Sequence, residues 1–103
     1  MSKDITREEV WNAIEKVEHP EIAVTLVDLG MVNDIAVRND TAVVAMSLPT
    51  LAIPELVRDA LVESIRKPIE SLGLKMEVEF FEMTEEVRNK FFSLSKANWK
   101  GAI

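Results

Sequence analysis

The sequence predicts a small α+β domain in which a three-stranded mixed sheet packs with helices, in the order α-β-β-α-β-α. Three segments place apolar residues at helical spacing, and three shorter segments are rich in the β-branched and apolar residues that strands prefer. The 103 residues provide enough apolar material for one modest core. We therefore expect residues 1–103 to form a single domain.

The first helix is expected to begin at Thr6, because Thr6 and Glu9 have the spacing of a capping box. Pro20 is expected to end it, since the residue before a proline avoids helical backbone. Residues 18–29 then form a long loop that is unusually apolar. Such a loop is expected to be ordered against the core.

Gly30 stands where this loop joins the first predicted strand, residues 31–38, and we expect it to adopt a positive φ. Asn39 and Asp40 both tolerate left-handed backbone, which predicts a tight hairpin into a second strand at residues 41–48. The second strand carries apolar residues on both faces. This pattern predicts a central strand that is covered, at least in part, on both sides.

A second helix follows a loop that is framed by prolines at positions 49 and 54. This helix is predicted either to end near Lys67 or to restart at Pro68, and Gly73 is expected to cap the segment. A third strand at residues 75–81 alternates apolar and charged residues, which predicts one buried face. A helical crossover would make it parallel to the second strand if the two are neighbours.

Thr84 is expected to cap the last helix, with acidic residues in its first turn. Val87, Phe91 and Leu94 lie at the spacing of an inward face. Phe92 cannot share that face with Phe91, so we expect it to point outward.

The composition excludes several kinds of function. The formal net charge of −6 opposes nucleic-acid binding, and no stretch approaches a membrane span or a signal peptide. We therefore expect neither nucleic acid nor membrane as a partner, and a cytoplasmic location. The absence of cysteine excludes disulfides, a thiolate nucleophile and any cluster held by this chain's own thiolates.

His19, the sole histidine, allows two interpretations. It could ligate a metal together with Glu21 and Asp28, or it could be a surface histidine at a helix end. Asp28 and Asp34 likewise could form an acid/base pair, or Asp28 could cap a turn while Asp34 faces solvent.

Ser47 and Thr50 flank the loop after the second strand. A small hydrolase or metal-dependent enzyme that used Asp28, Ser47 or Thr50 is one alternative. No nucleophile elbow is present, and the histidine lies far away in sequence. We expect no catalytic residue, no metal site and no cofactor.

Three segments together resemble the metal–sulfur cluster assembly family of small PaaD-like and SufT-like proteins. They are the run His-Pro-Glu-Ile that begins at His19, the run Val-Asp-Leu-Gly-Met-Val-Asn-Asp-Ile that begins at Val27, and Met-Thr-Glu-Glu-Val-Arg that begins at Met83. The family usually carries a cysteine in the loop after the second strand, and Leu51 holds that place here, with Ala52 where a proline usually follows. The chain thus resembles a cysteine-less variant.

The resemblance implies a non-enzymatic accessory or adaptor protein in iron–sulfur cluster assembly or delivery. Its partners would be a cluster-carrier ATPase or scaffold, or client apoproteins, and a homodimer is also possible. An accessory subunit of an aromatic-ring or phenylacetyl-CoA oxygenase pathway and a small hydrolase remain alternatives. The expected working surface combines residues 18–29 with residues 49–54; the alternative is that the apolar side chains of these loops simply cover the end of the core. Its candidate binding residues are Glu21, Asp28, Ser47, Thr50 and Leu51.

Overall fold

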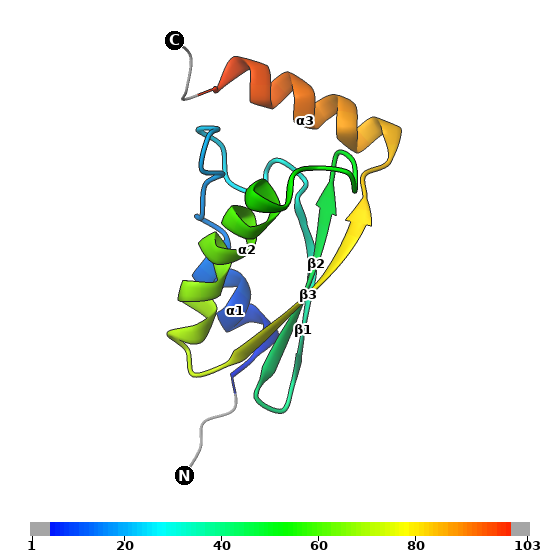
Figure 1. Ribbon diagram of the computed structural model, residues 1–103. Coiled ribbons are helices and arrows are strands. Elements are labelled where there is room, and N and C mark those ends of the chain that lie inside the picture. The colour runs from blue at the N-terminus through cyan, green and yellow to red at the C-terminus, as the bar shows by residue number, and fades with distance from the viewer. Residues whose placement is uncertain (1–4, 100–103) are drawn as a thin grey trace.

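The computed structural model describes residues 5–99 and has the predicted order of elements (Figure 1). The elements in chain order are α1 (Arg7–Ile14), β1 (Val32–Arg38), β2 (Thr41–Leu48), α2 (Glu55–Glu70), β3 (Lys75–Glu82) and α3 (Glu85–Ala97). The predicted α+β domain with a three-stranded mixed sheet is confirmed.

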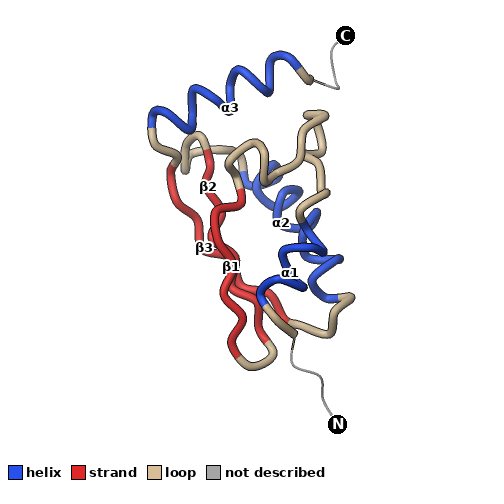
Figure 2. Tube along the Cα trace, turned by 180° about the vertical axis from the view of Figure 1, so that it is seen from behind, coloured by secondary structure: helices blue, strands red, loops and turns tan. Residues whose placement is uncertain are grey.

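The sheet has β2 at its centre, antiparallel to β1 and parallel to β3. Helices α1 and α2 lie on the same face of the sheet, and α3 lies across the end at which β2 and β3 finish (Figures 1 and 2). The core lies between the sheet and the first two helices, where alternate β2 residues and the inner face of α2 are buried. None of the helices within residues 5–99 combines the length and the apolar character that crossing a membrane requires.

Helix α1 begins as predicted and ends earlier than predicted. Both hydrogen bonds of the predicted capping box are present: the Thr6 side chain accepts from the Glu9 N–H, and the Glu9 side chain accepts from the Thr6 N–H. The helix stops at Ile14, however, well before Pro20, so the prediction that Pro20 ends it is wrong. The chain turns early because the carbonyl of Val17 accepts a 2.9 Å hydrogen bond from the Leu26 N–H, which draws the following loop back along the chain.

The loop at residues 18–29 packs against the core, as its apolar content predicts. Ile22, Leu26 and Leu29 have exposed fractions of 1% or less. Gly30 then adopts a φ of +76°, and Asn39 in the hairpin adopts a φ of 55°, so both turn predictions are confirmed.

Pro68 does not interrupt α2, which continues to Glu70, so both predicted alternatives are wrong. Pro68 lies in the last turn, where a missing N–H removes a single hydrogen bond from the helix. The fully buried side chain of Ile69 provides an opposing gain, because apolar burial stabilises the helical path. Gly73 follows with a φ of +87°, as expected of a capping glycine.

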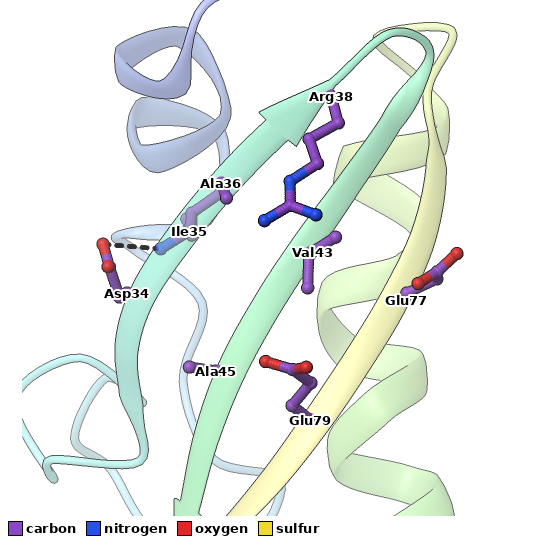
Figure 3. A pocket seen from close by; sticks show the side chains of 8 residues that line it. All are labelled: Asp34, Ile35, Ala36, Arg38, Val43, Ala45, Glu77 and Glu79. Atoms are coloured by element: carbon purple, nitrogen blue, oxygen red, sulfur yellow. Dashed lines mark hydrogen bonds between the residues drawn. The ribbon is translucent and has the colours of Figure 1, made fainter.

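The outer face of the sheet is only partly covered. Val43 and Ala45 on β2 are half-buried, and Figure 3 shows them on the near side of the sheet, with the helices behind it. They lie in a shallow hollow of about 190 Å³, and the side chain of Arg38 extends from β1 over β2 at its edge (Figure 3). Asp34, which also lines this hollow, faces solvent, as one interpretation of the sequence predicts. Its Oδ1 lies 2.7 Å from Arg7 Nη2 in an ion pair.

Candidate functional site

The predicted site residues lie in the loops at the end of the sheet and in the last turns of β2. Glu21 and Asp28 belong to the loop that precedes β1, whereas Thr50 and Leu51 belong to the loop between β2 and α2. Ser47 lies near the end of β2. Within residues 5–99, no hydrogen bond or ion pair joins any two of these five side chains. The structure therefore brings them to one end of the molecule without making a single polar cluster.

His19 is buried and does not stand at a helix end, so the surface interpretation is wrong. Its Nδ1 accepts a 3.0 Å hydrogen bond from the backbone N–H of Glu21. This contact uses one ring nitrogen to shape the turn, while the Glu21 side chain is exposed. No group of three or more potential ligands that could hold a metal occurs among the described residues, which gives the His19, Glu21 and Asp28 metal site no support.

The turn at Asp28 is capped by the side chain of Thr25 and not, as predicted, by that of Asp28. Thr25 Oγ1 accepts a 3.1 Å hydrogen bond from the Asp28 N–H, so Thr25 takes the capping role. The carboxylate of Asp28 is exposed. Asp34 pairs with Arg7 and forms no pair with Asp28, so the acid/base interpretation has no geometric basis.

Ser47 is buried and its hydroxyl donates a 2.6 Å hydrogen bond to Asn33 Oδ1. Its backbone N–H donates to the carbonyl of Met31 at 2.8 Å. Ser47 thus ties β2 to the start of β1. An amide oxygen accepts a proton poorly and is no general base, so this contact does not activate the hydroxyl as a nucleophile.

The loop at residues 49–54 is held at its base and exposed at its tip. Arg88 Nε donates a 2.8 Å hydrogen bond to the carbonyl of Pro49, and Arg88 Nη2 donates to the carbonyl of Met83 at 3.1 Å. Thr50 Oγ1 accepts from the Ala52 N–H at 3.2 Å, which makes a local turn. Leu51 at the tip is 53% exposed. The loop therefore presents an apolar side chain on a fixed backbone.

The two loops of the predicted working surface differ in the exposure of their large apolar side chains. Ile22 and Leu26 of the first loop belong to the core, whereas Leu51 and Ala52 of the second are exposed. Ile22 and Leu26 are buried because their loop folds over the end of the core beside α2. Of these two loops, it is therefore residues 49–54 that present an exposed leucine.

Helix α3 is seated on the end of the sheet by contacts that the sequence did not predict. A Cβ at Gly30 would lie 2.9 Å from Val87 Cγ1, so α3 closely approaches the backbone at Gly30. At the other end of α3, the Ala23 N–H donates a 2.8 Å hydrogen bond to the carbonyl of Asn98. Phe91 is buried and Phe92 is 53% exposed, as the helical spacing predicts. Residues 100–103 lie outside the described part.

Comparison with known proteins identifies the family. The sequence profile described as iron–sulfur cluster assembly protein matches residues 7–80. The chain belongs to this family. The match spans α1 to most of β3 and thus includes both loops, whereas α3 lies beyond it. No curated protein is similar enough to the chain to count as a match.

Solved structures of the same fold include three bacterial proteins. The chain is 23% identical to a domain of unknown function, DUF59, from Bacillus anthracis (TM-score 0.64; 86% of this chain and 91% of that chain). It is 31% identical to a conserved hypothetical protein from Thermotoga maritima (TM-score 0.56; 88% and 98%). It is 24% identical to a Mycobacterium tuberculosis protein described as associated with iron–sulfur complex assembly and repair (TM-score 0.54; 91% and 93%).

Proposed function

We propose that this chain is a non-enzymatic adaptor of the PaaD-like or SufT-like kind, which binds a protein partner in iron–sulfur cluster assembly through residues 49–54. One observation carries the proposal. Leu51 occupies the place where the resembled pattern has a cysteine, and it is 53% exposed on a loop whose base is held by Arg88. An exposed apolar side chain on a fixed loop is typical of a contact with another protein.

The cluster is cargo that this chain does not hold by itself. Iron–sulfur clusters are held mainly by thiolates, and the chain has no cysteine. Its single histidine is buried and accepts a backbone hydrogen bond. The adaptor therefore acts by bringing together proteins that do carry the ligands.

The stiffness of the loop favours binding. Prolines at positions 49 and 54 restrict the backbone, and Arg88 fixes the carbonyl of Pro49. A loop that is already ordered loses little conformational entropy when a partner covers it. Most of the free energy that is gained by burying the apolar surface of Leu51 then contributes to the affinity.

The partner is a cluster-carrier ATPase, a scaffold or a client apoprotein in the cytoplasm, and residues 1–103 act as one domain. A second copy of the chain would compete for the same surface as a homodimer. An oxygenase accessory role would use this surface for a different client. The hydrolase alternative lacks support, because the hydroxyl of Ser47 donates to Asn33 Oδ1, an amide oxygen that is no general base.

Leu51→Asp tests the proposal. The substitution leaves the fold intact, because the side chain is exposed, and it should abolish binding to the cluster-carrier ATPase of the same cell in a pull-down. Circular dichroism checks the fold. Ala36→Asp adds the same charge to another exposed position, in the middle of β1, and should bind as the parent does.

A folded Leu51→Asp protein that binds the carrier, the scaffold and the client proteins as tightly as the parent would remove residues 49–54 from the function. Unfolding of Leu51→Asp would show that Leu51 supports the core instead. Equal loss of binding in both variants would indicate a general charge effect, and would also contradict the proposal.

A further inference from the structure

A hollow of about 230 Å³ lies between the turn at residues 19–21 and the first two turns of α2. Its walls are mostly apolar. They are formed by His19, Pro20, Glu21, Leu56, Val57, Ala60 and Leu61. Sites for small molecules usually measure about 300–1,000 Å³. The hollow is therefore better matched to one apolar side chain than to a small-molecule ligand.

Leu56 stands at the rim of this hollow and is 84% exposed, more than any other large apolar side chain of residues 5–99. The adjacent Leu61 is buried and closes the floor. Leu56 therefore contributes little to folding by burial. Because apolar surface gains free energy only when water leaves it, Leu56 has most to gain from a bound partner.

The charges around the hollow are negative. Glu21 is the one carboxylate in its wall, and helical spacing places Asp59 on the same exposed face of α2 as Leu56. The nearby cation of α2, Arg58, has its guanidinium carbon 5.6 Å from the ring centroid of Phe80 and so lies toward the sheet. An occupant that carries positive charge beside an apolar side chain would complement this rim.

We propose that this hollow receives a segment of a protein partner in which a bulky apolar residue is flanked by lysine or arginine. The apolar side chain enters between Pro20 and Ala60 and packs against Leu56, while the flanking cations face Glu21 and Asp59. This inference rests on the proposed function, because it assumes that the chain binds a protein. It adds the chemistry by which that protein is recognised.

The test uses a synthetic peptide with both ends blocked, Lys-Lys-Leu-Lys-Lys, added to isotope-labelled protein in an NMR titration. We expect saturable shifts of the backbone amides of residues 19, 21 and 56–61. A peptide with alanine at its centre should bind about tenfold more weakly, because it buries much less apolar surface. A peptide with glutamate in place of lysine should give no saturable shifts.

Ala60→Arg fills the hollow at an exposed helical position and should abolish these shifts, whereas Ala97→Arg, the same change at an exposed position of α3, should preserve them. If Ala60→Arg fails to fold, Leu56→Ser provides the same test, with at least a threefold loss of affinity expected. Leu51→Asp should retain peptide binding, so its result separates this inference from the proposed function.

Three outcomes would overturn the inference. The first is the absence of saturable shifts, or shifts spread over the whole surface. The second is equal binding by the leucine and alanine peptides. The third is a concentration-dependent shift of residues 56–61 without peptide, which would assign the hollow to a second copy of the chain.

Discussion

Substitution of Gly30 tests how α3 is seated on the end of the sheet. Gly30 has a φ of +76°, and a Cβ there would lie 2.9 Å from Val87 Cγ1. Gly73 has a similar φ of +87°, but a Cβ there would meet nothing within 4 Å. Alanine therefore incurs the same kind of backbone strain at both positions, and a steric conflict at Gly30 only.

The magnitudes of the two effects can be estimated. A left-handed backbone costs an L residue about 1–2 kcal/mol, so Gly73→Ala should lower the free energy of unfolding by about that amount. Overpacking adds about 1–3 kcal/mol. Because Val87 is β-branched and rotates poorly about χ1, it cannot easily move away. Gly30→Ala should therefore destabilise the protein by about 2–5 kcal/mol.

Urea unfolding followed by circular dichroism measures both losses, and thermal midpoints should fall by about 4–8 °C for each kcal/mol. A double-mutant cycle with Val87→Ala isolates the contact. In the Val87→Ala background, the penalty of Gly30→Ala should fall to that of Gly73→Ala, a coupling of about 1 kcal/mol or more. Equal losses at the two glycines, or strict additivity in the cycle, would refute the close approach of α3.

Two further predictions concern contacts of arginine side chains, and a third concerns the absence of cysteine. Arg88→Ala should destabilise by about 1.5–3 kcal/mol and speed hydrogen exchange in residues 50–53; Arg66→Ala, which removes a surface pair, should leave that exchange unchanged. Hydrogen bonds from Arg7 hold the pKa of Asp34 below its ordinary 3.8. The stabilisation from the Asp34–Arg7 pair is thus present above pH 3.8 and is lost as the pH falls through the lowered pKa of Asp34. The Arg7→Gln substitution should return the pKa of Asp34 toward 3.8, as measured by NMR titration. Anaerobic addition of iron and sulfide should leave the purified protein colourless, and a stoichiometric charge-transfer band would contradict this.

The features that could be predicted from the sequence are those with local physical causes. The capping box at Thr6 and the positive φ of Gly30 depend on a few neighbouring residues. The alternation of β3 similarly predicts which of its faces is the less exposed, although Met76, Val78 and Phe80 on that face are only half-buried. The path of α2 through Pro68 was not predictable, because it depends on how deeply Ile69 is buried in the assembled core.

The candidate site was less predictable because its contacts join distant parts of the chain. Arg88 reaches Pro49, and Ser47 reaches Asn33, across separations that no local pattern encodes. The apolar content of residues 18–29 and of residues 49–54 looked alike, yet Leu26 and Leu29 of the first loop are buried and Leu51 of the second is exposed. Only the assembled fold decides which apolar loop covers the core and which one faces solvent.

The loop tip and the hollow are linked by chain continuity, since α2 begins directly after residues 49–54. Leu51 and Leu56 are 53% and 84% exposed, and neither gains much from folding. A partner that covered both would bury apolar surface beside a fixed loop and an acidic rim, close to the centre-and-rim arrangement of specific interfaces. If one partner does so, Leu51→Asp and Ala60→Arg should each weaken its binding, whereas only Ala60→Arg should affect the short basic peptide. The comparison would thus show whether one interface spans the loop and the hollow or whether two surfaces serve different partners.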